Sequence, residues 1–600
     1  MNRPNPAIVA QDAVRRLPRV ALWLFCLAYL LPGWVGREPW KSLDMGAFGY
    51  MQAMAQGTSD WLQPRLMGQP PEIDALLPYW LGAWFLQMGP AWVDPALLAR
   101  LPFILLSGLT LAGTWYGVYY LARADQAQPV AFAFGGEASP KDYARTLADA
   151  GLLALIACLG LARMSHEITP LLAQLAWVSL VFYGVAVVVA HPGRSLVAFA
   201  LGLAGLTLSG APSLALILGL GSVLLCQLDP AVRQRRVLWG LLLICLLAAL
   251  LAQALEVWRW RLVSLPEEAA AWRSLLRLMM WFTWPAWPLA LWTVWRWRGH
   301  WTSLRWSRHL VIPLWFALVA LVTAVMTGSP DRTLLLALPA LAALAAFALP
   351  TLKRSVKALI DWFTLLFFSG CALVIWVVWL AMQTGWPAKP AANVVRLVPG
   401  FTPQFGAMAF ALALLATGVW CWLVRWRVGR HRAALWKSLV LPASGAALCW
   451  LLLMTLWLPM LDFARSYAPL VRNVVALMGG PSPCVQVHGL TQGQLAAFQY
   501  HGRLRLAPLV QPGPVAAGPV AADPSSAPAA GSPQCPWLIV DSDALSTLAG
   551  GPHLSSWARV QTVRRPSDDN EDVVLWRRIA PEAQRNDAPS SSPVPNPIRP

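Results

Sequence analysis

Long apolar stretches recur along the chain, and short polar or basic segments separate them. A helix needs about 20 apolar residues to cross a hydrocarbon core of about 30 Å. By that length, residues 1–460 contain about thirteen candidate membrane spans. They begin near residues 18, 97, 147, 170, 195, 213, 238, 276, 309, 332, 362, 405 and 438. The pattern predicts an all-α polytopic membrane domain.

Proline and glycine interrupt this apolar pattern. His191-Pro192-Gly193 and Gly210-Ala211-Pro212 cut one long apolar stretch into two short helices. In the long loop at residues 36–96, the apolar run from Leu76 to Leu86 contains Pro78 and is too short to cross. It predicts an interfacial helix that lies along the membrane surface.

Beyond residue 460, apolar and polar residues alternate in three segments, at 484–488, 537–541 and 572–576. Alternation with period two is typical of strands, and helical patterns occur at 491–500 and 541–548. Residues 461–580 are therefore expected to form a small α/β domain. Residues 507–533 are rich in Pro, Ala, Gly and Ser and predict a disordered insertion, and 581–600 predict a disordered tail.

Composition excludes a soluble enzyme, because 57% of residues are hydrophobic and only 12% are charged, against about 25% charged in soluble domains. The net charge of +18 by itself suggests a nucleic-acid partner. However, the basic residues lie in short loops between apolar runs rather than on a solvated domain. We therefore expect no nucleic-acid partner.

The basic loops instead predict orientation, since cytoplasmic loops carry an excess of Lys and Arg. With a cytoplasmic N-terminus, every strongly basic loop falls on the cytoplasmic side, near residues 233–236, 296–308, 353–357 and 425–437. An odd number of spans then places loop 36–96, and everything after about residue 460, on the opposite side.

The nine cysteines divide into two groups. Seven lie in apolar spans without CxxC spacing, which favours a role as small buried hydrophobic residues over metal binding. Cys484 and Cys535 both lie in the C-terminal domain. In an oxidising compartment, such a pair favours a disulfide.

Polar residues are densest in the first loop and form an ordered set of motifs. These are Gly36-Arg37-Glu38-Pro39-Trp40-Lys41-Ser42-Leu43-Asp44, a helix expected from Met51 to Gln56, Asp60-Trp61-Leu62-Gln63-Pro64, a Pro-rich turn, Tyr79-Trp80 and Ala99-Arg100-Leu101-Pro102. Together with Gly205 to Pro212 and Ser329-Pro330-Asp331-Arg332, the set resembles the GT-C lipid-linked-sugar glycosyltransferases of the aminoarabinose transferase and protein O-mannosyltransferase superfamily.

This resemblance implies a GT-C-like membrane domain with an exported α/β domain. It also implies transfer of a sugar from a polyprenyl-phosphate donor to a lipid A, glycan or protein acceptor. The implied location is the periplasmic face of a bacterial inner membrane, with the N-terminus cytoplasmic and the C-terminal domain periplasmic. Membrane lipid, the donor and the acceptor are the expected partners.

Such a reaction needs a carboxylate as general base or acceptor-orienting group, and cations for the departing phosphate. The resemblance assigns the carboxylate to Asp44, while the alternative is a solvated loop acid that caps the following helix. Glu167 in the short second loop is the second catalytic candidate, and it could also simply face water. Candidates for donor or acceptor binding are Trp40, Lys41, His166, Tyr79 and Arg332.

The chain also departs from the family pattern. Met45 stands where a Glu usually follows the catalytic Asp, and Asp74, beside Glu72, stands where a Lys is usual. Ser209 stands where a Lys or Arg is common, so two phosphate-facing cations are missing. A divalent metal remains open, because Glu72, Asp74, His166 and Glu167 are suitable ligand types, but their spacing forms no metal motif.

Two other functions stay open. A lipid or glycan transporter or flippase fits the many spans, although such proteins place ionisable groups near the membrane midplane and often show internal repeats. We find neither in the sequence. A catalytically degenerate GT-C scaffold fits the missing cations.

The charge pattern makes a prediction about topology. Reporter fusions at Arg430 should report cytoplasm, and fusions after Ser466 should report periplasm, because one span separates a basic loop from the C-terminal domain. Activities of paired alkaline phosphatase and fluorescent-protein fusions measure this. Finding both positions on one side of the membrane would rule out the proposed span count.

Overall fold

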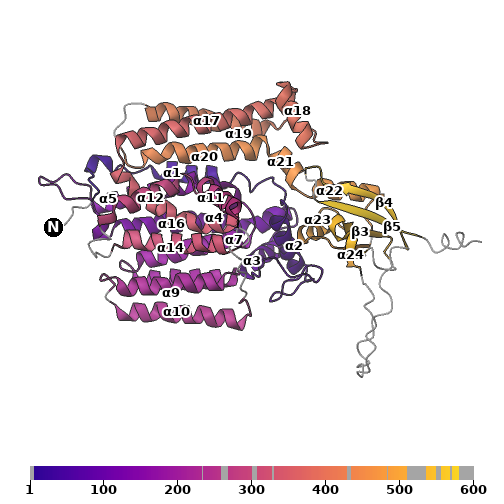
Figure 1. Cartoon of the computed structure of the whole chain (residues 1–600), viewed down its shortest axis with the longest axis horizontal. Helices are drawn as coiled ribbons and strands as arrows, with labels where there is room; N and C mark the ends of the chain where they lie inside the picture. The colour runs from indigo at the N-terminus through magenta and orange to yellow at the C-terminus, as the bar shows by residue number, and fades with distance from the viewer. Residues whose placement is uncertain are drawn as a thin grey trace, which may run out of the picture.

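A computed structural model shows a bundle of helices with a smaller C-terminal domain at one end (Figure 1). It describes residues 6–232, 234–258, 268–299, 307–327, 330–428, 434–482, 484–509, 535–548, 556–567 and 571–579. The described part of the bundle is helical, and the five described strands lie in the C-terminal domain. The prediction of an all-α polytopic domain followed by an α/β domain is confirmed.

The bundle helices correspond to the apolar stretches of the sequence. They are α1 (Arg19–Leu30), α4 (Pro95–Ala122), α5 (Pro140–Ala157), α6 (Leu159–Met164), α7 (Pro170–Val187), α8 (Pro192–Leu208), α9 (Pro212–Leu228), α10 (Arg235–Ala254), α11 (Ala269–Phe282), α12 (Ala286–Arg296), α14 (Arg308–Met326), α15 (Pro330–Thr333), α16 (Leu338–Ala348), α17 (Arg354–Thr384), α18 (Ala388–Leu397), α19 (Ala407–Val428) and α20 (Lys437–Leu456). Pro192 and Pro212 open α8 and α9, so the predicted interruptions are confirmed.

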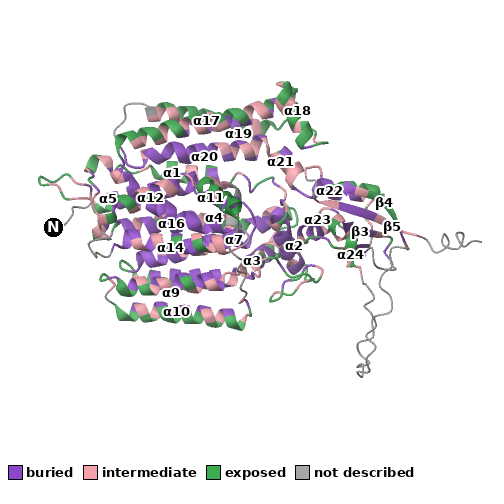
Figure 2. Ribbon diagram, in the orientation of Figure 1, coloured by how far each residue is buried: buried purple, intermediate pink, exposed green. Residues whose placement is uncertain are grey.

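Within the described residues, eight helical segments are long and apolar enough to cross a membrane. Three other predicted spans, near residues 18, 195 and 213, correspond to the shorter apolar helices α1, α8 and α9. The spans predicted near 147 and 276 fall on α5 and α11, which belong neither to these eight segments nor to the shorter apolar helices. Burial varies across the bundle (Figure 2). In the most apolar stretch of the segment containing α16, 94% of the residues are buried, against 11% in the corresponding stretch of α19. α19 therefore presents apolar side chains outward, as a helix facing lipid does.

The first loop contains two helices, α2 (Leu43–Ala55) and α3 (Leu77–Met88). The apolar run at 76–86 therefore forms the expected short helix. In contrast, the helix expected from Met51 to Gln56 begins earlier, at Leu43, and takes Asp44 into its first turn. Gly46 and Gly49 lower helix propensity there, which concealed this start in the sequence. Close packing requires Gly49, because a Cβ at this position would lie 2.4 Å from the Cβ of Ala496.

Five strands form the sheet of the C-terminal domain, in the order β2-β1-β3-β5-β4. They are β1 (Val485–His488), β2 (Leu506–Pro508), β3 (Trp537–Asp541), β4 (Trp557–Arg564) and β5 (Asp572–Arg578), accompanied by α21 (Leu458–Arg465), α22 (Ala468–Leu477), α23 (Gln492–Tyr500) and α24 (Leu545–Leu548). β1 pairs in parallel with β2 and β3, and β5 pairs antiparallel with β3 and β4.

The predicted insertion boundary at 507 is wrong, because Ala507 and Pro508 belong to β2, where they pair with β1. Their small or cyclic side chains gave no alternating apolar signal. The rest of the predicted insertion, apart from Leu509, and the predicted tail at 581–600 lie outside the described residues.

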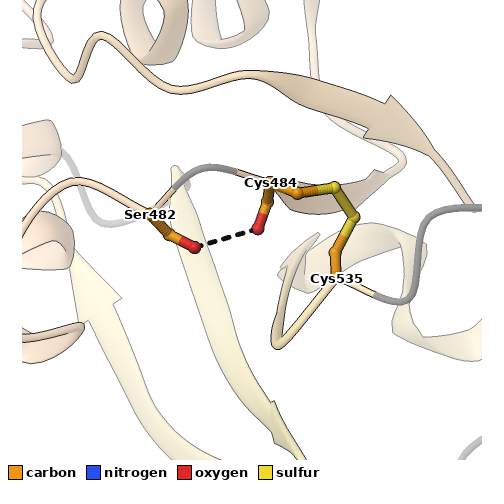
Figure 3. Close-up of a disulfide and its surroundings, with 3 residues drawn as sticks. All are labelled: Ser482, Cys484 and Cys535. Atoms are coloured by element: carbon orange, nitrogen blue, oxygen red, sulfur yellow. Dashed lines mark hydrogen bonds between the residues drawn. A yellow bond between two sulfur atoms is a disulfide. The ribbon is translucent and has the colours of Figure 1, made fainter.

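A disulfide joins Cys484 to Cys535, which lie 51 positions apart in the sequence, as predicted (Figure 3). The Ser482 hydroxyl donates a hydrogen bond of 3.0 Å to the Cys484 carbonyl beside it. The two cysteines precede the parallel strands β1 and β3, so the bridge fastens the middle of the sheet at one end.

The C-terminal domain rests on the first loop through α23. Gln492 Nε2 donates a 2.6 Å hydrogen bond to the Pro70 carbonyl, and the Tyr500 hydroxyl donates one of 3.0 Å to Asp94. A capping box between Thr491 and Gln494 fixes the start of α23. The domain is therefore held over the long loop at both ends of this helix.

The disulfide makes a prediction about stability. Replacing Cys484 and Cys535 by Ser should destabilise the C-terminal domain by roughly 4 kcal/mol in the chain-entropy model, since closing a long loop restricts the unfolded chain. Limited proteolysis of the purified full chain against urea measures this. Cys421→Ser, at an exposed cysteine on α19, is the control and should change nothing. Equal urea midpoints for the double variant and the wild type would contradict the prediction.

Candidate active site

Asp44 lies in the first turn of α2 with its side chain only 1% exposed. Its Oδ2 accepts hydrogen bonds of 3.0 Å from Arg37 Nη2 and from the Trp40 backbone N–H. Its Oδ1 accepts one of 2.7 Å from the Ile168 backbone N–H. Ser42, not Asp44, occupies the N-cap position. Asp44 is therefore neither solvated nor a cap of α2, but joins the first loop to the second.

Two buried guanidinium groups lie beside this carboxylate, since Arg37 is 2% exposed and Arg100 is 1% exposed. Arg37 Nη2 also donates to the His166 carbonyl at 2.5 Å, and Arg100 Nη1 donates to the carbonyls of Trp34 and Arg37. Arg37 Nε and Nη1, and Arg100 Nε and Nη2, make no hydrogen bond within the described residues. This arrangement favours an anionic group with several acceptor oxygens.

Trp40 and Lys41 connect the cluster to later parts of the chain. Trp40 Nε1 donates a 2.7 Å hydrogen bond to Asp462 in α21. Lys41 Nζ lies 3.4 Å from Glu571 of the C-terminal domain, and Glu571 also pairs with Arg565 at 3.0 Å. Both predicted binding residues thus contact acidic partners that are distant in the sequence.

The second loop places His166 and Glu167 next to the cluster. His166 is fully buried, and its Nε2 lies 3.3 Å and 3.2 Å from the carbonyls of Tyr29 and Leu30. Burial lowers the pKa of His166 to about 3, so the ring is neutral at neutral pH. Glu167 is 7% exposed and immediately precedes Ile168, whose N–H binds Asp44.

A cavity of about 370 Å³ opens beside the first turn of α2, between the long loop and the start of α23. Its lining includes Tyr79, whose hydroxyl donates a 3.1 Å hydrogen bond to the Ile73 carbonyl. Glu72 is an acidic residue of the wall, and no Lys or Arg is among the described residues that line it. The remaining lining residues are Ser42, Leu43, Gly46, Ala47, Tyr50, Gln69, Pro170, Thr491, Gln492 and Gly493.

Asp74 and Ser209, the two positions where the sequence resemblance led us to expect cations, are neighbours in space. The Leu76 N–H donates a 2.8 Å hydrogen bond to the Leu208 carbonyl, and a Cβ at Gly210 would lie 2.8 Å from the Asp74 carbonyl. The loops that carry Asp74 and Ser209 therefore lie side by side. Ser209 is buried, and its carbonyl accepts a hydrogen bond from Gln174 within the bundle.

An apolar groove of about 630 Å³ runs between α1, α19 and α20. Two hydroxyl groups in its wall, those of Ser444 and Thr455, donate to carbonyls of their own helix. The groove therefore offers mainly hydrocarbon contacts. Leu31, Pro32, Gly33 and Val35 line it, and the chain continues from them directly to Arg37.

Arg332 lies in the short helix α15, which precedes α16. Among the described residues, no hydrogen bond or ion pair connects its side chain to Asp44, Arg37 or Arg100. The structure thus brings together Asp44, Trp40, Lys41, His166 and Glu167, with Tyr79 in the adjacent cavity.

The residues proposed as metal ligands do not form a metal site. No group of three or more His, Cys, Asp or Glu side chains in the described ranges has a geometry that could hold an ion. His166 turns both ring nitrogens toward backbone carbonyls, and Glu72 faces the cavity.

Sequence reasoning missed Arg37, Arg100 and Asp462 as members of the cluster. A signal for Arg100 was present, because an arginine inside an apolar helix is costly and usually has a specific partner. Arg37 belongs to the first-loop motif at residues 36–44, but nothing in the sequence identifies its partner. Asp462 had no signal, since only the folding of α21 against the first loop brings it to Trp40.

No family model matches the sequence, and no curated protein matches it. Among solved structures, ArnT from Cupriavidus metallidurans bound to undecaprenyl phosphate matches with a TM-score of 0.55 and 17% identity, over 93% of this chain and 96% of that chain. ArnT in the apo state matches with a TM-score of 0.54 and 16% identity over the same shares. At this identity the likeness shows the fold, and the chain is a polytopic membrane protein with the GT-C fold.

Proposed function

We propose that this protein is a glycosyltransferase that moves a sugar from a polyprenyl-phosphate donor to an acceptor. One observation supports this most directly: a single short segment connects three environments that the reaction needs. Leu31, Pro32, Gly33 and Val35 line the apolar groove, and Arg37 and Asp44 form the charged cluster. Ser42, Leu43, Gly46 and Ala47 line the cavity beside α2. A lipid chain, a phosphate and a sugar could thus occupy adjoining places.

The groove supports a donor with a hydrocarbon chain, because its wall exposes mainly apolar side chains. The fold likeness supports the same donor class, since one ArnT structure is bound to undecaprenyl phosphate. The acceptor class stays open among lipid A, glycan and protein.

Asp44 is the general base or acceptor-orienting group in this proposal. The acceptor oxygen attacks the anomeric carbon, its proton passes to Asp44, and the bond from that carbon to the phosphate oxygen breaks. Arg37 and Arg100 supply the positive charge that the departing phosphate needs, in place of the cations missing at Asp74 and Ser209. Only 1% of the Asp44 side chain is exposed to solvent. Substrates therefore reach it only when the residues that cover it move.

The remaining predicted residues take supporting roles. Glu167 is proposed as the second carboxylate, next to Ile168, and Tyr79 as a sugar contact in the cavity wall. Trp40, Lys41 and neutral His166 stabilise the positions of the residues around Asp44. A donor contact by Arg332 stays a prediction.

We also propose that the protein lies in a bacterial inner membrane, with the N-terminus cytoplasmic and the C-terminal domain periplasmic. The loop charges support this orientation. The Cys484–Cys535 disulfide supports it independently, because disulfides persist in oxidising compartments such as the periplasm.

Asp44→Asn should reduce sugar transfer by about 100-fold or more, because it removes the base while keeping the side-chain size. Mass spectrometry of envelope glycolipids and glycoproteins, per amount of folded protein, measures the effect. Asp229→Asn is the matched control, since it removes a buried carboxylate that pairs with Arg308 at 2.8 Å near the other end of α7. Wild-type transfer by Asp44→Asn at wild-type abundance would exclude the catalytic assignment.

Glu167→Gln should lower transfer by about tenfold or more if Glu167 assists proton transfer, since the amide cannot take up a proton. The measurement is the initial rate in membranes with added donor extract. Glu167→Asp keeps the charge and should restore part of the rate. If Gln and Asp variants both retain the full rate, Glu167 has no role in the chemistry.

A further inference from the structure

Trp40 donates hydrogen bonds to two carboxylates from different parts of the chain, one from its backbone N–H and one from its indole ring. Its backbone N–H donates a 3.0 Å hydrogen bond to Asp44, and its indole Nε1 donates one of 2.7 Å to Asp462. Asp44 belongs to α2, whereas Asp462 belongs to α21, which follows α20 and leads toward the C-terminal domain. Trp40 is 3% exposed, so both contacts are shielded from water.

Further contacts hold the Trp40 ring in one orientation. The guanidinium carbon of Arg37 lies 4.5 Å from the ring centroid, and that of Arg465 lies 5.3 Å from it. The Lys41 backbone N–H donates a 2.9 Å hydrogen bond to the Arg465 carbonyl, and Trp40 forms an isolated antiparallel bridge with Ser466. The segment that carries Arg37 and Trp40 is thus attached to α21 and not only to its own loop.

Charged groups from two other elements, and one from its own helix, lie around Asp462. Arg37 and Glu38 come from the first loop, Arg100 comes from α4, and Arg465 lies on the same helix near the Trp40 ring. Burial raises the pKa of Asp462 to about 7, although the hydrogen bond from Trp40 and the charge of Arg37 act in the opposite direction. Its charge therefore changes within the neutral range of pH.

Keeping this carboxylate ionised has a cost. The pKa in the folded chain lies above the value of about 3.9 for an exposed Asp. The folded state therefore binds the proton more tightly than the unfolded state does, and folding stability falls as pH rises from about 4 to about 7. A buried amide or serine could accept the indole N–H without this penalty, which indicates that the negative charge itself has a use.

We propose that Asp462 is a positioning residue whose negative charge, acting through Trp40, holds Arg37 and Asp44 in the geometry required for transfer. This inference rests on the proposed function. The ionised carboxylate makes a charge-assisted hydrogen bond to the indole, which is stronger than a neutral one, and balances the second of the two buried arginines. Protonation removes both effects and loosens the segment from Arg37 to Asp44.

The first test is the pH profile of transfer, measured from about pH 5 to about pH 9. Below about pH 7, the wild-type rate should fall by about tenfold per pH unit. Asp462→Asn, whose amide oxygen can still accept the indole N–H, should have a lower rate above that pH and should lose this dependence. Trp40→Phe, which removes the N–H, should behave in the same way.

The control is Asp361→Asn. Asp361 lies in α17, away from Trp40 in the sequence, and its carboxylate pairs with Arg427 at 2.5 Å. This variant should keep the wild-type pH profile.

A second measurement does not require activity. Amide hydrogen exchange of residues 34–48, corrected for the intrinsic effect of pH, should be faster at about pH 6 than at about pH 8 in the wild type, and independent of pH in Asp462→Asn. An Asp462→Asn variant with the wild-type pH profile or the wild-type exchange difference would overturn the proposal. If the wild type transfers no sugar but shows this exchange pattern, the proposed function fails while the positioning role stands. If Asp462→Asn does not fold, the pH profile and the hydrogen exchange of Trp40→Phe test the proposal instead. A wild-type pH profile or a wild-type exchange difference in Trp40→Phe would then overturn it.

Discussion

The buried ion pair between Arg37 and Asp44 is the constraint on which the rest of the candidate site depends. Two charges removed from water are tolerated only when their geometry is good and further hydrogen bonds satisfy them. Here the Asp44 carboxylate accepts from Arg37, Trp40 and Ile168, so it ties the first loop to the second. Removing either charge would leave the other one buried and unpaired.

Glycines in α2 determine how closely the C-terminal domain approaches this ion pair. Gly46 and Gly49 face the start of α23, and a side chain at Gly49 would collide with Ala496. Gly493 approaches the Ser42 carbonyl in the same way, since a Cβ there would lie 3.0 Å from it. These close contacts place the start of α23 in the wall of the cavity. The C-terminal domain is thus part of the site and not an appended module.

The positions of positive charge in this chain differ from those that the sequence resemblance implies. The loops with Asp74 and Ser209 lack the cations expected from the sequence resemblance, whereas Arg37 and Arg100 place two buried guanidinium groups next to Asp44. A phosphate requires positive charge nearby, but not from a fixed sequence position. The missing motif cations are therefore weak evidence for a degenerate scaffold.

The sequence by itself determined the membrane character, the helical bundle, the α/β nature of the C-terminal domain and the Cys484–Cys535 pairing. These follow from local patterns: apolar length, period-two alternation and the presence of two cysteines in one domain. It also singled out Asp44, although through family resemblance and not through any visible partner.

Only the tertiary structure decided what surrounds Asp44. The start of α2 at Leu43 was hidden by glycines that only long-range packing explains. Asp462 is far from Trp40 in the sequence, and Arg100 lies in another helix, so no periodicity could place them together. Burial and the charges nearby set the pKa of Asp462, and both come from elements that meet only when the whole chain has folded.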